Sequence, residues 1–170
     1  MKKISRAKST APKKTSSKLT SGPAREYPDL HEHLAALDRA GMLITVDREI
    51  NKDTEMHPLV RWQFRGGIAE PDRKAFLFTN VTDSKGHKYD IPVVVGALAA
   101  NREIYSTGMG CKIEDIGKTC NKAIANPIKP RVVKEAPCQE IVYMGKDLLK
   151  PGQGLDGIPV PISSPGWDNA

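Results

Sequence analysis

The four histidines of this sequence are candidates for metal binding or acid–base catalysis. His31 and His33 lie two residues apart in a segment expected to be helical. Their side chains therefore point in different directions and cannot grip one metal ion as an i, i+4 pair would. We expect both on a solvated helix face. His57, near an expected helix start, and His87, in an expected turn, have no serine or cysteine nucleophile beside them in a recognised motif.

The cysteines offer no metal site or disulfide framework. Cys111, Cys120 and Cys138 are odd in number and form no C-x-x-C pair. We expect all three to act as small buried hydrophobic residues.

Two glycine pairs could present backbone N–H groups to a phosphate. Gly108-Met109-Gly110 precedes a helix expected near Lys112, and Gly152-Gln153-Gly154 follows Pro151. Neither has the Walker lysine-serine/threonine ending or the G-x-G-x-x-G spacing. Glycines that end a helical turn are the more common cause of the first pattern, and we favour that interpretation.

Aromatic residues beside arginines suggest a surface for stacking bases. Trp62 and Phe64 lie between Arg61 and Arg65, but helical spacing favours aromatics in the core with arginines at its edge. Trp167 lies in an expected turn, where it could form a pocket wall or a hydrophobic plug between domains. Both interpretations of Trp167 remain open.

Helices and strands must position these residues, and their order predicts the fold class. Asp29 is expected to cap a first helix, in which Leu30, Leu34 and Leu37 recur at helical spacing before Gly41. The sequence then predicts a strand over 42–50, followed by a helix that is capped by Asn51 or Asp53, has Pro58 in its first turn and ends at Gly66-Gly67. Strands over 75–81 and 91–98 are expected in one sheet. A short helix over 102–106 that ends at Gly108 and Gly110, a helix over 113–124 and a strand over 138–144 complete the predicted order. This order predicts a mixed sheet with packed helices over residues 28–126, an α+β fold or an α/β domain. Residues 127–170 hold more Pro and Gly and predict the start of a second, β-rich domain.

The basic charge of the chain belongs to its first residues. Residues 1–25 carry eight basic residues and no acidic one, while the net charge of the chain is +6, so residues 26–170 sum to −2. We expect a disordered basic tail over 1–27, since it has too few apolar residues to form a core. A solvated extension is the favoured interpretation, with attachment to polyanions or membranes and a targeting peptide as alternatives. No transmembrane segment is expected, and we expect a cytoplasmic protein.

The last residues suggest that the chain is an incomplete piece. An apolar Ile-Pro-Val-Pro-Ile run over 158–162 needs a partner surface to cover it.

Several segments resemble, in the same order, the opening of the UbiD-like decarboxylases, the polyprenyl-hydroxybenzoate carboxy-lyase type. They are Asp29-Leu30, 43–50 (LITVDREI), 75–81 (AFLFTNV) and 92–96 (PVVVG), followed by Cys138-Gln139-Glu140, Asp147-Leu148 and 155–169. The resemblance covers residues 28–170. It implies that 127–170 begin a split-barrel flavin-binding domain.

The resemblance also implies a function and a cofactor. Family members reversibly decarboxylate aromatic or α,β-unsaturated acids with prenylated FMN and a divalent metal, with or without a monovalent cation. The residues that bind these groups lie downstream and have no matching position here, so no catalytic, cofactor-binding or metal residue is assigned. Asp168-Asn169 also stands where the family has an aspartate-glycine pair.

We therefore expect the N-terminal portion of a carboxy-lyase, inactive by itself. Its implied partners are the remainder of the decarboxylase, further copies in a homo-oligomer, and a flavin prenyltransferase that supplies the cofactor. The alternative is a non-catalytic accessory or assembly subunit that docks through its apolar C-terminal segment. A third hypothesis, nucleic-acid binding through residues 1–25, explains only the tail, and we expect no nucleic-acid partner.

Overall fold

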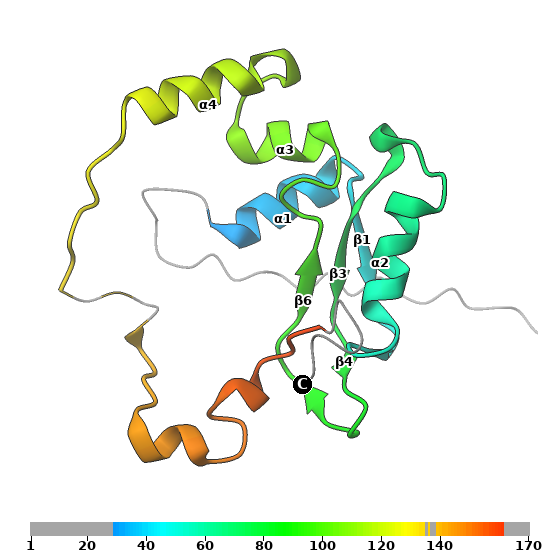
Figure 1. Cartoon of the computed structure of the whole chain (residues 1–170), viewed down its shortest axis with the longest axis vertical. Helices are drawn as coiled ribbons and strands as arrows, with labels where there is room; N and C mark the ends of the chain where they lie inside the picture. Colours follow the sequence, from blue (N-terminus) through cyan, green and yellow to red (C-terminus); the bar gives the residue numbers. More distant parts are fainter. Residues whose placement is uncertain (1–28, 135, 137–138, 162–170) are drawn as a thin grey trace, which may run out of the picture.

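The computed structural model describes residues 29–134, 136 and 139–161, and places a small sheet between helices (Figure 1). The described helices are α1 (Leu30–Arg39), α2 (Met56–Arg65), α3 (Arg102–Met109) and α4 (Ile116–Ala125). The strands are β1 (Leu43–Val46), β2 (Ile50–Asn51), β3 (Ala75–Phe78), β4 (Val81–Thr82), β5 (Lys88–Tyr89) and β6 (Val93–Val95). Short 3₁₀ turns are η1 (Glu70–Asp72), η2 (Ile113–Asp115), η4 (Gly145–Leu149) and η5 (Leu155–Gly157). The predicted α+β fold with mixed sheets and packed helices is confirmed.

The strands form two three-stranded sheets that follow one another along the chain, with β3 at the centre of the first and β4 at the centre of the second. β1 pairs in parallel with β3, and β6 pairs antiparallel on the other side. The arrangement repeats further along, where β4 lies between parallel β2 and antiparallel β5. Between β3 and β4 the central strand has two residues, Thr79 and Asn80. Each neighbouring strand has three residues over the same stretch, 47–49 and 90–92, so each neighbour carries one extra residue there. Such insertions bend a sheet, which explains why each predicted strand is split or shortened.

Helices cover both faces of this sheet and form two apolar clusters. Because side chains alternate along a strand, Phe76 and Phe78 pack in the cluster that includes α2, while Ala75 packs in the cluster of α1 and α3. The first cluster holds Ile50, Met56, Val60, Phe76, Phe78, Val81 and Tyr89. The second holds Leu37, Ala75, Ala97, Ala100 and Ile104.

The first helix forms as its sequence predicts. The Asp29 side chain accepts hydrogen bonds from the backbone N–H groups of His31 and Glu32, and the Glu32 side chain accepts the N–H of Asp29 at 2.7 Å. This reciprocal capping box fixes where α1 begins. Gly41, with a φ of +68°, follows the end of the helix, and Leu37 is fully buried.

The second helix has the predicted end but a different cap and a different buried face. Its first residue is Met56, and the Asn51 side chain caps the preceding turn instead, by accepting the N–H groups of Asp53 and Thr54. Pro58 is the third residue, and Gly66 is the C-cap, as expected.

The aromatic residues of this helix were predicted to lie in the core, and that prediction is wrong. Trp62 is 61% exposed and Phe64 is 41% exposed. The buried face carries Met56, Val60 and Gln63 instead. Gln63 takes the core position because its side-chain amide pairs both ways with the Lys74 backbone.

The strand predicted over 91–98 is reduced to β6. Gly96 has a φ of +77° and turns the chain, so that Ala97 and Ala100 pack into the second cluster. Asn101 then caps α3 by accepting the N–H of Ile104 at 2.7 Å. β3 and β6 do share one sheet, as predicted.

Beyond α3 the chain leaves the packed body. α4 contains no buried residue, and Asn126-Pro127 end it as expected. The described residues after α4 contain no strand, so the predicted strand over 138–144 is wrong for 139–144. Ile141, Val142 and Met144 are exposed there, because no described strand lies beside them to accept pairing.

Candidate functional site

The glycine-rich segment between α3 and α4 does not form a phosphate loop. Gly110 has a left-handed φ of +61° and ends α3, and its N–H bonds the carbonyls of Ser106 and Thr107. The helix-ending interpretation is therefore confirmed for Gly110. Gly108 was expected to break the helix but lies inside it, next to the His33 ring, where an added Cβ would be 3.3 Å from Cε1.

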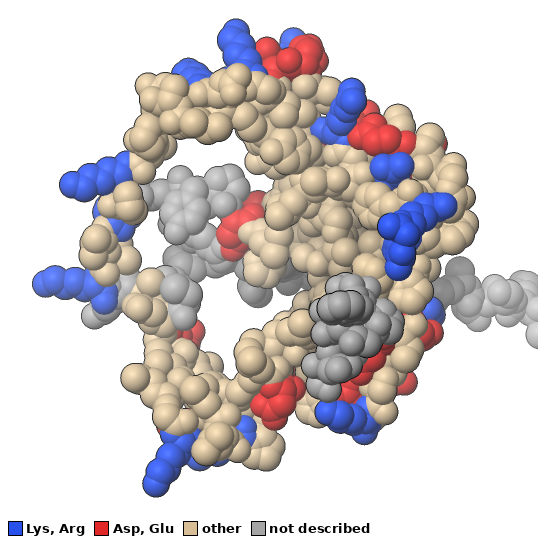
Figure 2. Space-filling model, viewed as in Figure 1, with Lys and Arg blue, Asp and Glu red and all other residues tan. Residues whose placement is uncertain are grey.

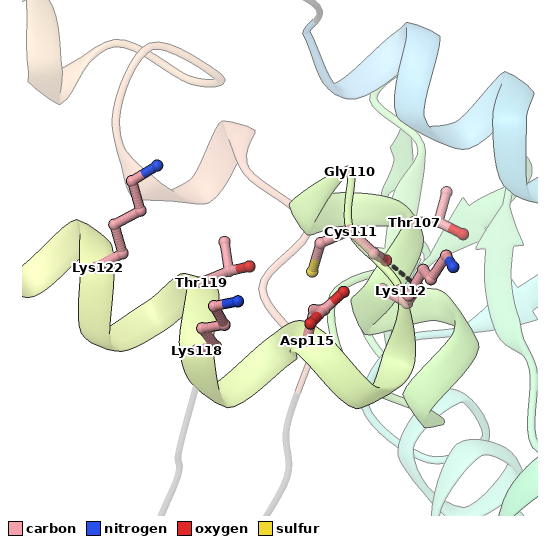
Figure 3. A pocket seen from close by; sticks show the side chains of 9 residues that line it. Thr107, Gly110, Cys111, Lys112, Asp115, Lys118, Thr119 and Lys122 are labelled. Atoms are coloured by element: carbon pink, nitrogen blue, oxygen red, sulfur yellow. Dashed lines mark hydrogen bonds between the residues drawn. The ribbon is translucent and has the colours of Figure 1, made fainter.

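An open groove of about 750 Å³ lies between the end of α3 and α4 (Figure 3). We call it the basic groove; it is lined by Ser106, Thr107, Gly110, Cys111, Lys112, Asp115, Lys118, Thr119 and Lys122. Figure 3 shows Lys118, Thr119 and Lys122 along α4. In the described part of the chain, no carboxylate pairs with the three lysines. The groove can attract anions by charge, but flexible exposed lysines do not fix a ligand's position.

A second, smaller cleft of about 420 Å³ lies between η1, the start of α3 and the start of α4. We call it the arginine cleft; it is lined by Phe64, Glu70, Arg73, Ala99, Ala100, Asn101, Arg102, Tyr105, Ile113 and Ile116. Its walls are mainly apolar, in contrast to the basic groove.

A buried ion pair lies at the far end of the sheet. Lys52 Nζ is 2.6 Å from Asp53 Oδ1, and the two side chains are 4% and 11% exposed. The ammonium also lies 5.9 Å from the centre of the Tyr89 ring. The other oxygen of Asp53 accepts the N–H of Ser84, and the Tyr89 hydroxyl donates to Asp83. This cluster ties the end of β2 to the β4–β5 turn.

The hydrogen bonds of this cluster shift its pKa values. Burial of Asp53 acts to raise its pKa, but the bonds from Lys52 and the Ser84 N–H outweigh burial and lower the pKa. Desolvation also acts to raise the pKa of Asp83, but hydrogen bonds from the backbone N–H groups of His87 and Lys85 outweigh it and lower the pKa. Burial, followed by the bond to Asp83, raises the pKa of Tyr89. The ionised carboxylates and the neutral phenol are therefore the forms that fit the fold.

The histidines do not come together at a site. His31 is exposed beside its helix cap, as expected, but His33 is half-buried and donates from Nε2 to the Ala97 carbonyl at 2.6 Å. The solvated-face prediction is therefore wrong for His33, because α3 packs against that side of α1. His87 packs edge-on against Tyr89, with ring centres 4.5 Å apart.

The second glycine pair is closed by the chain itself. Asp156 accepts the N–H of Gly152 at 2.8 Å and that of Gly154 at 3.2 Å. The Gly152 bond is the largest of the contributions that lower the pKa of Asp156. The N–H groups of this turn therefore do bind an anion, but that anion is the carboxylate of Asp156 in the same turn.

The remaining singled-out residues carry no chemistry in the described ranges. Cys111 and Cys120 are half-buried free thiols, and Cys120 Sγ lies 4.0 Å from Met109 Sδ. They are thus less buried than expected. Cys138, Trp167 and the basic tail over 1–27 lie outside the described residues.

The described residues do not fit a flavin with its metal. A flavin phosphate needs several fixed donors or a bound cation, whereas the N–H groups of Gly110 and Cys111 beside the basic groove are already bonded within α3. Across the described ranges, no three His, Cys, Asp or Glu side chains are arranged to hold a metal ion. No described helix is long and apolar enough to cross a membrane.

The described segment after α4 exposes many large apolar side chains to solvent. We call residues 126–161 the exposed arm; its large apolar residues in solvent are Ile128, Val132, Val133, Ile141, Val142, Tyr143, Met144, Leu148, Leu149, Leu155, Ile158 and Val160. Residues 112–134, which include α4 and the start of the arm, carry six basic and two acidic residues. Figure 2 shows Lys and Arg side chains on the outside of the molecule in this region. Exposed apolar surface of this kind is typical of interaction sites.

Sequence reasoning missed the buried Lys52 and the arginine cleft. Lysine is rarely buried, so only its neighbour Asp53 could have suggested a pair. The cleft joins residues from 64 to 116 that no local pattern connects.

Solved structures that align with this chain include two enzymes. One is the UbiD-class enzyme HmfF from Pelotomaculum thermopropionicum in complex with FMN, with a TM-score of 0.58 and 29% identity over 80% of this chain. The other is the vanillic acid decarboxylase of Sedimentibacter hydroxybenzoicus in open form, with a TM-score of 0.54 and 25% identity over 68% of this chain. The alignments cover 27% and 24% of those two chains, so this chain spans about a quarter of their length.

A sequence model of one protein family matches residues 34–124. That range runs from within α1 to within α4, so it contains the whole sheet and both apolar clusters. The match covers more than half of the chain and agrees with the resemblance of its strand segments. The chain therefore belongs to the family described as the 3-octaprenyl-4-hydroxybenzoate carboxy-lyase N-terminal domain.

Proposed function

We propose that this chain serves as the N-terminal domain of a UbiD-like carboxy-lyase that acts on an aromatic or α,β-unsaturated acid. The observation that carries the proposal is the family match over 34–124, in a chain whose described residues fit neither a flavin nor a metal. The reacting groups would then belong to the remainder of the enzyme, and this chain would be inactive alone.

The role of the domain in that enzyme is to cover one side of the active-site cleft. The exposed arm supports this role, because Ile128 and Val132 are 94% and 95% exposed and need a partner surface. We propose that the flavin-binding domain, a split barrel, provides that surface. The described arm would run along it and bury its apolar residues there.

The cofactor and the remaining partners are further parts of the proposal. The similar HmfF structure contains FMN, and the other similar structure is a vanillic acid decarboxylase. We propose prenylated FMN with a divalent metal for the complete enzyme. The cofactor would come from a flavin prenyltransferase, and the enzyme would work as a homo-oligomer inside the cell.

The test combines the 170-residue chain with a UbiD-class decarboxylase that lacks its own N-terminal domain. Bound flavin is measured by absorbance, and carbon dioxide release is measured with an aromatic acid. The chain alone should retain no flavin and release no carbon dioxide, whereas the mixture should show turnover. Stoichiometric flavin with turnover in the chain alone would overturn the proposal.

A matched pair of variants tests the role of the arm. Ile128→Ser with Val132→Ser should weaken complementation, because it removes apolar surface that the partner would cover. Leu98→Ser is the control, since Leu98 is also exposed but lies in the body, between β6 and α3. Equal effects of both variants would mean that the arm has no special role. Binding to a partner with no flavin enzyme in it would favour the accessory-subunit alternative.

A further inference from the structure

The arginine cleft has the size and the lining of a small-molecule site. Its volume of about 420 Å³ falls within the range of ligand pockets. Phe64, Tyr105, Ile113 and Ile116 form its apolar walls. Two of these four residues are aromatic, so the walls can accommodate a flat apolar ring.

Arginine side chains give this cleft a positive charge with unused donors. Arg73 Nε is buried and has no hydrogen-bond partner. The Arg73 guanidinium lies 5.2 Å from the centre of the Phe64 ring, so it is held against an aromatic face. In the described part of the chain, no carboxylate forms an ion pair with Arg73 or Arg102. The guanidinium carries further N–H donors besides the buried Nε, and an anion in the cleft can pair with those.

The backbone beside these arginines is held in place. Asn101 is buried, and its Nδ2 donates to the carbonyl of Arg73 at 2.6 Å. Glu70 Oε1 accepts the N–H of Arg102 at 2.6 Å. Glu70 is the only acidic residue in the lining, so the lining keeps a net positive charge with two arginines. The backbone that carries both arginines is therefore fixed before a ligand binds.

We propose that the arginine cleft binds a small aromatic carboxylate. The carboxylate pairs with Arg73 and Arg102, because the planar guanidinium fork matches carboxylate geometry. The ring of the ligand packs between Tyr105 and the isoleucines of η2 and α4. This binding is a property of the chain itself, beyond its proposed place in a decarboxylase, and no chemical step occurs in the cleft.

The test is an amide NMR titration of the 170-residue chain with three probes. Benzoate carries both ring and charge, benzamide keeps the ring without the charge, and acetate keeps the charge without the ring. Benzoate should give saturable shifts at the cleft and bind at least about tenfold more tightly than either analogue. Equal affinity for benzamide, or shifts confined to the basic groove, would overturn the proposal.

Variants separate the site from general anion binding. Arg73→Met should weaken benzoate binding about tenfold or more, and Arg73→Lys should restore it only in part, because lysine lacks the fork. Arg61→Met is the control, since Arg61 is an exposed arginine of α2 that does not line the cleft. If Arg73→Met does not fold, Arg102→Met replaces it. Unchanged affinity in the folded arginine variants would contradict the site, and none of these outcomes depends on flavin or a partner.

Discussion

The domain body, residues 29–115, and the exposed arm, residues 126–161, treat the same kinds of side chain in opposite ways. Ile50 is fully buried in the body, whereas Ile128 in the arm is 94% exposed. Each region also has a lysine-aspartate pair at 2.6 Å, Lys52 with Asp53 and Lys150 with Asp147. The first pair is buried, and the second is 60% and 48% exposed.

The difference teaches that the described body buries its own apolar residues, while the described arm leaves its apolar residues in solvent. In the body, β1 and β3 pair although they lie more than 30 residues apart, and helices cover the apolar faces of these strands. The arm has no described strand to pair with. The following predictions test whether burial, rather than residue type or distance, decides what each interaction contributes.

The largest effect is expected at the buried ion pair. Lys52→Met leaves the buried Asp53 carboxylate with the Ser84 N–H but without its cation, and should lower the free energy of unfolding by about 3–5 kcal/mol. Lys150→Met breaks an exposed pair of the same length and should cost about 0–1 kcal/mol. Urea unfolding of both variants measures the contrast. Similar losses in the two variants would show that Lys52 is not buried in solution.

The next contrast uses one residue type in the two regions. Ile50→Ala should lower the free energy of unfolding by about 2–5 kcal/mol, because it leaves a cavity in the first apolar cluster. Ile128→Ala should change it by less than about 0.5 kcal/mol. The measurement is the shift of the urea midpoint in the isolated chain. A large loss in Ile128→Ala would mean that the arm packs on the body.

Acid and alkali should unfold the body from opposite sides of neutrality. The folded state lowers the pKa of Asp53 and Asp83 below the ordinary 3.8, so their contribution is present above that pH and is lost as pH falls through the lowered values. Tyr89 has a raised pKa, so its contribution is present below pH 10.0 and is lost at higher pH. Urea midpoints measured against pH should therefore fall at both ends. Tyr89→Phe should flatten the alkaline limb, and an unchanged limb would contradict the Asp83 contact.

The fold was predictable wherever short-range chemistry decides it. The cap at Asp29, the helix end at Gly66 and the left-handed Gly110 follow from residue type and spacing alone. Trp62 and the strand over 138–144 were not predictable in the same way. The buried face of α2 depends on where the sheet lies, and a strand needs a neighbour that this segment does not have among the described residues.

The candidate sites were less predictable than the fold. The glycine pairs attracted attention by their composition, yet Gly110 ends a helix and Gly152 binds the carboxylate of Asp156. The arginine cleft has no sequence motif, because Arg73 and Arg102 line the same cleft only after β3 and β6 have paired. Long-range pairing therefore creates the sites that local patterns do not predict.

The smallest effect is expected at two helical glycines. Gly117→Ala in α4 should stabilise the chain by up to about 1 kcal/mol, since alanine favours helix and nothing lies within 4 Å of the added Cβ. Gly108→Ala in α3 should gain less or lose stability, because its Cβ meets the His33 ring at 3.3 Å. Thermal unfolding compares the two. A larger gain for Gly108→Ala would mean that α3 does not press on α1.

Hydrogen exchange of the arm tests the central claim most directly. In the isolated 170-residue chain, amides of 128–134 and 141–149 should exchange without protection while those of β3 remain protected. Adding the decarboxylase that lacks its N-terminal domain should slow exchange in the arm, as its apolar residues become covered. Arm amides that are already protected in the isolated monomer, or that stay unprotected in a mixture with restored turnover, would contradict the account.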